Sequence, residues 1–153
     1  MAFTNSNDFI TGRVSPRYPA GGEVVAERFT LAIPTGDLAL NTIGQIGILP
    51  AGCVPVAFYV DGTDMDSSTA AMVLQAGILD AAGTAFSTAA ADGGAAWGST
   101  TAVNTAFQQQ ILSQPMMTVT PTNADRKIGI KVTTAPTTAV AGTLAVTLHY
   151  KAA

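Results

Sequence analysis

The sequence has few charged side chains and almost none of the residues that usually carry out catalysis. Charged residues make up 11% of the 153 residues, whereas soluble domains have roughly 25%. Only one cysteine, Cys53, and one histidine, His149, are present, so a clustered zinc site and a nucleophile–base pair with an orienting group are not expected. We therefore expect a protein that is not an enzyme and uses no cofactor, with Cys53 as a small buried side chain and His149 on an outward strand face.

Two further absences restrict the partners. No run approaches 18 consecutive apolar residues, and residues 1–10 lack the basic start and apolar run of a signal peptide. The isoelectric point is 4.7, whereas nucleic-acid-binding domains typically have values above about 9. The sequence thus predicts synthesis in a cytoplasm and contact with neither a membrane nor a nucleic acid.

Positive charge is missing from the whole middle of the chain. Every Lys and Arg lies in residues 1–28 or 126–151, and the interval between them carries seven Asp residues. This separation indicates either a molecule with one basic and one acidic end, which could steer docking, or solvated loops that simply carry Asp.

The end of the chain alternates apolar and polar residues in two runs, 126–133 and 142–150. Because successive side chains of a strand point to opposite faces, each run places its apolar residues on one face. The pattern is typical of an antiparallel sheet with one dry side. The apolar residues are Ile128, Ile130, Val132, Leu144, Val146, Leu148 and Tyr150.

Earlier segments repeat strand patterns at short spacing. Runs around 25–33, 43–48, 54–60 and 72–78 predict strands, 117–119 begins another, and 103–111 predicts a short helix or an irregular strand. About seven or eight strands at this spacing predict an all-β antiparallel β-sandwich or barrel, as one domain over 23–153. The earlier strands are expected to add Val54, Val56, Phe58 and Val60 to the core.

Residues 1–22 contain too many Asn, Gly and Pro residues for a helix or a paired strand. Apolar side chains are nevertheless spaced along this segment, at Phe3, Phe9, Ile10, Val14 and Tyr18. We expect an extended N-terminal arm, residues 1–22, that lies against its own sandwich or against a neighbouring subunit.

Two other features could bind a ligand, and each has a simpler interpretation. Asp61, Asp64 and Asp66 could surround calcium, but the run lacks the Gly and Glu of a helical calcium loop, which favours a solvated hairpin turn. Trp97 lies in a long loop of small residues, 83–105. It could stack on a sugar, although a packing role is favoured for a single Trp without aromatic neighbours.

Three segments carry a resemblance to a known family: Arg17-Tyr-Pro-Ala-Gly-Gly22, Asn41-Thr-Ile-Gly-Gln-Ile-Gly-Ile-Leu-Pro-Ala-Gly-Cys-Val-Pro-Val56 and Arg126-Lys-Ile-Gly-Ile-Lys-Val132. With them the chain resembles head decoration, or cement, proteins of tailed bacteriophages, which have a jelly-roll-like sandwich. The similar residues form strands and turns, so the resemblance transfers no catalytic site.

The resemblance implies a virion structural protein on the outside of the phage head that binds the major capsid protein and stabilises the shell. It also implies a homo-oligomer, with a trimer favoured. The residues expected to contact the capsid or another copy are Phe3, Phe9, Arg13, Arg17, Tyr18 and Trp97. The alternative is a carbohydrate- or receptor-binding module of a virion fibre or spike, in which Trp97 and the Asp61–Asp66 turn would face the host.

Overall fold

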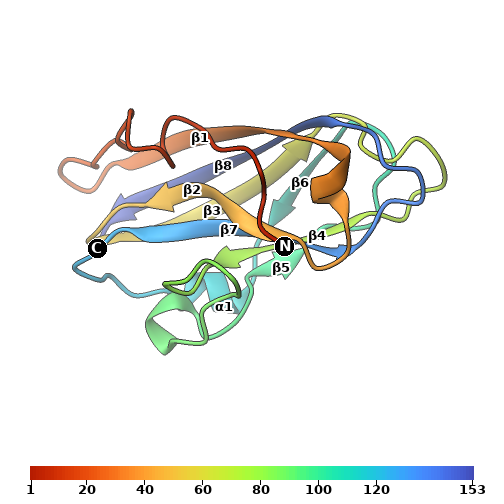
Figure 1. The fold of residues 1–153 in the computed structure, drawn as a ribbon. Coiled ribbons are helices and arrows are strands. Elements are labelled where there is room, and N and C mark those ends of the chain that lie inside the picture. Colours follow the sequence, from red (N-terminus) through yellow and green to blue (C-terminus); the bar gives the residue numbers. More distant parts are fainter.

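A computed structural model describes residues 1–153 as two four-stranded antiparallel sheets packed face to face (Figure 1). The first sheet has the order β1-β8-β3-β6 and the second has the order β2-β7-β4-β5. The strands are β1 (Val24–Ile33), β2 (Ile43–Leu49), β3 (Cys53–Gly62), β4 (Val73–Ile78), β5 (Gly98–Ser99), β6 (Phe107–Ile111), β7 (Arg126–Thr134) and β8 (Gly142–Ala152). The expected all-β sandwich is confirmed.

The strand order is that of a jelly roll. In a jelly roll eight strands wind through two Greek keys, so that the first strand pairs with the last and each inner pair follows in turn. Here β1 pairs with β8, β2 with β7, β3 with β6 and β4 with β5, all antiparallel. The jelly-roll-like topology implied by the resemblance is therefore present.

One apolar core fills the space between the sheets. It contains 27 buried residues from both sheets and from the loops at their ends. Eight of the expected core residues belong to it, because strands β7 and β8 and the second half of β3 keep the predicted alternation. These residues are Phe58, Val60, Ile128, Ile130, Val132, Leu144, Val146 and Leu148.

The prediction was wrong for Val54 and Val56, which are only half-buried. The pairing of β3 with β8 shifts between Pro55 and Ala57, so the strand has a bulge at Val56. A bulge inserts one unpaired residue and exchanges the two faces of the strand on either side of it. Cys53 is therefore buried at the start of β3, in the place expected for Val54.

Strand β2 has the same kind of irregularity. Its pairing with β7 shifts between Gln45 and Gly47. As a result Ile46 and Leu49 are buried, whereas Ile48 is half-buried. The Gly and Ile pattern of this strand thus reflects a bulge as well as burial.

The segment after β5 differs in part from the expectation. Residues 107–111 form strand β6, the second of the two predicted alternatives. The strand expected from Met117 is wrong, because Gln114–Met117 form a single helical turn, α1. Ser113 caps this turn through its side chain, and Pro115 favours a helix start at this position. Two short 3-10 turns, Thr35–Leu38 and Ala90–Asp92, complete the helical structure, and no helix is long and apolar enough to cross a membrane.

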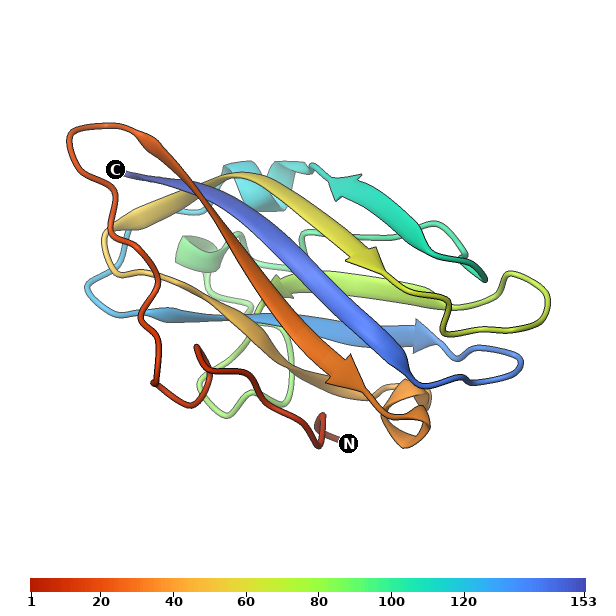
Figure 2. The same cartoon turned by 90° about the horizontal axis from the view of Figure 1, so that it is seen from above.

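The N-terminal arm lies against its own sandwich. In Figure 2 the red segment runs along the side of the sandwich where the orange strands β1 and β2 lie. These two strands are edge strands of different sheets, so the arm covers one open side of the sandwich. The arm was expected to lie either against its own sandwich or against a neighbouring subunit, and in the structure it lies against its own sandwich.

Candidate contact surface of the arm

Aromatic side chains hold the arm on the sandwich. The Phe9 ring packs edge-on against Phe29 of β1, with 4.7 Å between ring centroids. The Phe3 ring lies over Gly44 of β2, where a Cβ atom would be only 2.6 Å from Phe3 Cδ2. Phe3 and Phe9 therefore anchor the arm to its own sandwich. Both side chains are half-buried, and the packed part of each ring faces the sandwich.

Polar contacts attach the first residues of the arm to both sheets. The amide side chain of Asn5 donates to the carbonyl of Ala32 in β1 at 2.7 Å, and that of Asn7 donates to the carbonyl of Ile46 in β2 at 2.8 Å. The backbone N–H and the hydroxyl of Thr4 donate to the buried carboxylate of Asp37 at 2.8 and 2.9 Å. The two asparagine bonds satisfy strand-edge carbonyls that would otherwise need water or another chain as a hydrogen-bond partner.

A second set of contacts holds the end of the arm. The buried Tyr150 hydroxyl on β8 donates to the Arg17 carbonyl at 2.6 Å, and the Arg17 N–H donates to a Glu27 side-chain oxygen at 3.3 Å. Burial, followed by the nearby Glu27 carboxylate, raises the pKa of the Tyr150 phenol above its ordinary value. Tyr150 thus stays a neutral donor across the physiological pH range.

The outward side of the arm carries the exposed members of the expected contact set. Arg13, Arg17 and Tyr18 are exposed, Tyr18 to 63%, and Val14 beside them is 44% exposed. Arg13 makes only a loose ion pair at the surface, 3.6 Å from Asp8. We refer to Arg13, Val14, Arg17 and Tyr18 as the arm surface.

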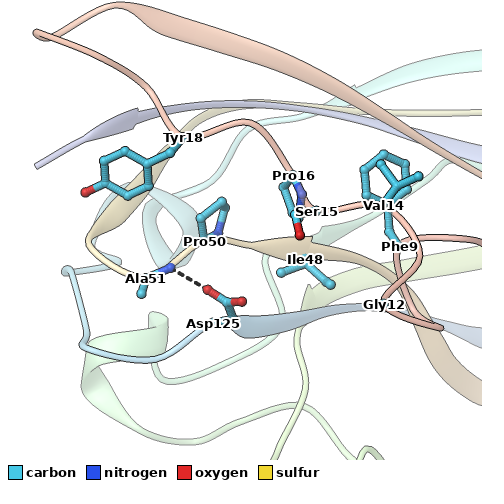
Figure 3. A pocket seen from close by; sticks show the side chains of 10 residues that line it. All are labelled: Phe9, Gly12, Val14, Ser15, Pro16, Tyr18, Ile48, Pro50, Ala51 and Asp125. Atoms are coloured by element: carbon cyan, nitrogen blue, oxygen red, sulfur yellow. Dashed lines mark hydrogen bonds between the residues drawn. The ribbon is translucent and has the colours of Figure 1, made fainter.

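A shallow groove of about 310 Å³ separates the arm surface from the turn between β2 and β3 (Figure 3). Val14, Pro16 and Tyr18 form one wall, and Ile48, Pro50 and Ala51 lie across from them. Asp125 lies at the rim, where its carboxylate accepts a hydrogen bond from the Ala51 N–H at 2.8 Å. Five of the ten residues that line the groove are hydrophobic, and such a lining is suited to binding.

Trp97 lies in the core and is not part of any contact surface, contrary to its place in the expected contact set. Its side chain is fully buried, with the ring edge-on to Phe58 at 5.4 Å between centroids. The loop returns to strand β4, where the backbone N–H of Trp97 donates to the Ala76 carbonyl at 2.7 Å. A large apolar ring stabilises the fold most when it fills the space between the sheets, and the favoured packing role is the one observed.

The three carboxylates of the Asp61–Asp66 turn have separate roles. Asp61 forms an ion pair with Arg28 at 2.6 Å, and Asp64 accepts from the Asp66 N–H at 3.0 Å. Asp66 is buried and accepts from the backbone N–H groups of Thr137 and Thr138 at 3.1 and 3.0 Å. No group of three His, Cys, Asp or Glu side chains that could hold a metal ion comes together in the structure.

Arg126 is a buried residue whose role the sequence analysis missed. Its guanidinium donates to the carbonyls of Cys53, Thr120 and Ala91 at 2.8, 2.9 and 3.1 Å, and contacts the Asp92 carboxylate at 3.3 Å. One signal was present, because Arg126 has the same alternation as Ile128 and Ile130 and therefore points inward. The Arg126–Asp92 and Arg28–Asp61 contacts each pair an aspartate from the stretch without Lys or Arg with an arginine that flanks this stretch.

His149 and Cys53 lie on the neighbouring strands β8 and β3. His149 is half-buried on the outer face of β8, with its ring 5.4 Å from that of Tyr59. Cys53 is buried, and burial raises the pKa of its thiol, although the Arg126 charge opposes this shift. A neutral buried thiol is a poor nucleophile.

Comparison with solved structures shows the same fold in phage capsids. A chain of the capsid of Ralstonia phage GP4 matches with a TM-score of 0.77 and 23% identity over 97% of both chains. A chain of the cyanophage Pam1 capsid asymmetric unit matches with a TM-score of 0.53 and 19% identity over 90% of both chains. No protein-family model and no curated protein matches the sequence. The chain therefore shares its jelly-roll fold with chains of two phage capsids.

Proposed function

We propose that the chain is a capsid decoration, or cement, protein that binds the outside of a phage head and stabilises the shell. The observation that carries the proposal is the match to a chain of the Ralstonia phage GP4 capsid, which extends over 97% of both chains. A match of this extent includes the arm as well as the sandwich. The proposed partner is the major capsid protein, and the proposed place is the virion exterior, with a homo-oligomer for which the resemblance favours a trimer.

The arm surface is the proposed contact with the shell. It combines two exposed guanidinium groups with exposed aromatic and apolar side chains, and Tyr and Arg are the residue types most enriched at binding hot spots. Since the arm is already ordered on its own sandwich, binding through it needs little further loss of backbone entropy.

The proposed mechanism is linkage between binding and shell stability. A protein that binds only the assembled lattice stabilises that lattice by mass action, and many copies that bridge neighbouring subunits add avidity. A chain in which only 11% of the residues are charged is suited to such permanent contact.

The alternative of a sugar- or receptor-binding module has lost the two features that suggested it. Trp97 is buried, and Asp66 is saturated with hydrogen bonds from its own chain. No group of three His, Cys, Asp or Glu side chains suggests a metal site in their place.

The test uses particles of the phage that encodes the chain. Quantitative mass spectrometry of purified virions should find hundreds of copies per particle, whereas a fibre module would be present in a few dozen at most. A reconstruction of the particle should place the copies on the head exterior. A low copy number, or density confined to the tail, would overturn the proposal.

A binding assay then tests the arm surface. Particles that lack the chain are incubated with the wild-type protein or with Arg13→Ala/Arg17→Ala/Tyr18→Ala, and bound protein is measured after sedimentation. The matched control, Lys127→Ala/Lys131→Ala/Val140→Ala, removes the same charge and one other exposed apolar side chain. The arm variant should bind particles weakly, and the control should bind like the wild type. Equal binding by both variants would show that the arm surface is not the contact with the particle.

The absence of catalysis belongs to the same proposal. His149→Ala and Cys53→Ser should leave particle assembly and infectivity unchanged, apart from modest effects on stability. A measurable turnover that either substitution abolishes would contradict a purely structural role.

A further inference from the structure

The sandwich has four edge strands, and three of them are protected against pairing with another chain. An edge strand exposes unpaired backbone groups, and proteins protect it by short length, charged residues, bulges or a covering segment. The arm covers β1 and β2, β1 also carries Glu27 and Arg28, and β2 has a bulge. Strand β5 has only two residues.

Strand β6 has none of these protections. Its sequence, Phe-Gln-Gln-Gln-Ile, pairs with β3 in one unbroken register and contains neither a charged residue nor proline. In fact no residue between Asp92 and Asp125 carries a charge. On the other side of β6 the turns and loops form no backbone hydrogen bond with residues 107–111. In Figure 2 this teal strand lies at the rim of the molecule with nothing beyond it.

The exposed side chains along β6 are also unpartnered. Gln108 and Gln110 are exposed, whereas Gln109 is held from inside through two hydrogen bonds with Thr101, at 2.7 and 2.8 Å. Leu112, immediately after the strand, is 60% exposed. This edge is thus uncharged, free of bulges and partly apolar.

We propose that β6 is a self-association edge, which pairs antiparallel with β6 of a second copy about a two-fold axis through Gln109. The pairing joins the two first sheets into one continuous eight-stranded sheet. The inference goes beyond the proposed function, because it concerns the free protein and not its contact with a capsid.

The order of residues along this edge favours a second copy over an unrelated strand. Residues 106–112 read Ala-Phe-Gln-Gln-Gln-Ile-Leu, which has the same pattern of polarity in both directions. About the two-fold axis, Gln108 faces Gln110 of the second copy, and Phe107 faces its Ile111. Glutamine both donates and accepts hydrogen bonds, so a Gln–Gln pair is complementary to itself. Apolar residues meet apolar residues at both ends, and like charges meet nowhere.

The size of the contact predicts how strong the association is. One pair of short strands is far smaller than the interface of a stable dimer, so the free protein should dimerise weakly. A concentration series is therefore the appropriate measurement.

The experiment measures the mass of the purified full chain by sedimentation up to about 1 mM, where even weak dimers are populated. Gln108→Lys/Gln110→Lys places lysines opposite one another across the axis. Gln108→Lys/Gln110→Glu places each lysine opposite a glutamate, but only in the proposed two-fold register. The control, Ala26→Lys/Thr30→Lys, adds the same charge to exposed positions on β1, at the opposite edge of the same sheet. Circular dichroism verifies that each variant is folded.

We expect the wild type, the lysine–glutamate variant and the β1 control to dimerise, and the double-lysine variant to dimerise roughly tenfold more weakly or worse. A wild type that stays monomeric at about 1 mM overturns the inference. A dimer or trimer that still forms in the double-lysine variant also overturns it. The same holds if the lysine–glutamate variant dissociates as readily as the double-lysine variant. Particle binding is measured separately, so failure of either proposal leaves the other standing.

Discussion

The hydroxyl of Tyr150, on the last strand, donates a hydrogen bond to the carbonyl of Arg17, in the N-terminal arm, at 2.6 Å. These residues are 133 positions apart in the chain. The bond fixes the arm just before β1 begins, and it places Arg17 and Tyr18 on the outside of the sandwich. The position of the arm surface therefore depends on a side chain from the opposite end of the sequence.

We expect Tyr150→Phe to loosen the end of the arm without unfolding the sandwich. The substitution keeps the buried ring and removes one hydrogen bond, which contributes about 1 kcal/mol. Hydrogen exchange should become faster for the backbone amides of residues 17–23, while those of β7 keep their protection. Tyr59→Phe, on the outer face of β3, is the control and should change neither region.

Deletion of residues 2–20 should leave a folded sandwich that is less stable and binds capsids much more weakly. The deletion removes the contacts of Phe3 and Phe9 and uncovers the edges of β1 and β2. Thermal melting and particle sedimentation measure the two effects.

Phe9→Ala separates anchoring from recognition in the arm. It should cost about 1–3 kcal/mol, less than a fully buried Phe, because Phe9 is only half-buried. Arg13→Ala/Arg17→Ala should leave the melting temperature nearly unchanged and weaken particle binding. If the protein that lacks residues 2–20 binds particles as tightly as the full chain, the arm does not contact the capsid.

Arg126→Met should destabilise the fold by about 3–5 kcal/mol, because it leaves the Asp92 carboxylate and three carbonyls without their buried donor. Equilibrium unfolding in urea measures the loss. Lys127→Met is the neighbouring exposed control and should stay within about 0.5 kcal/mol of the wild type. Equal effects of the two substitutions would contradict the role of Arg126 as a buried hydrogen-bond donor that stabilises the fold.

Stability should fall in acid partly through Asp66. Burial raises the pKa of its carboxyl, but hydrogen bonds from the N–H groups of Thr138 and Thr137 and from Ser68 outweigh this effect and lower the pKa. A carboxyl whose pKa is lowered by folding contributes stability that is complete above the unfolded value of about 3.9 and is lost as the pH falls through the folded value.

Asp66→Asn should therefore reduce stability at pH 7 and also weaken its dependence on pH below about 4. Melting temperatures recorded from neutral to acidic pH test this prediction. Asp8→Asn, at an exposed site in the arm, should keep the wild-type acid dependence. An unchanged acid transition in Asp66→Asn would show that the pH dependence has another origin.

The alternation of apolar and polar residues was sufficient to predict much of the fold. In strands β1, β4, β7 and β8 the apolar residues that the alternation placed on one face are buried. The lack of nucleophiles and metal ligands predicted a protein without catalytic chemistry, and this stays a prediction. The contact role of Arg13, Arg17 and Tyr18, whose side chains are exposed, also stays a prediction.

Long-range contacts decided the remaining features. The bulges at Val56 and Ile46 reverse the buried face, and a bulge is defined by its partner strand rather than by local sequence. Trp97 and Phe9 occupy different surroundings because one fills the space between the sheets and the other covers a side of it. Arg126 is buried only because oxygen atoms of Cys53, Ala91, Asp92 and Thr120 meet around it, three of them from residues more than 30 positions away. Periodicity therefore determined which segments are strands, whereas the tertiary structure decided which faces are buried and which edges stay open, since burial and pairing depend on residues far apart in the chain.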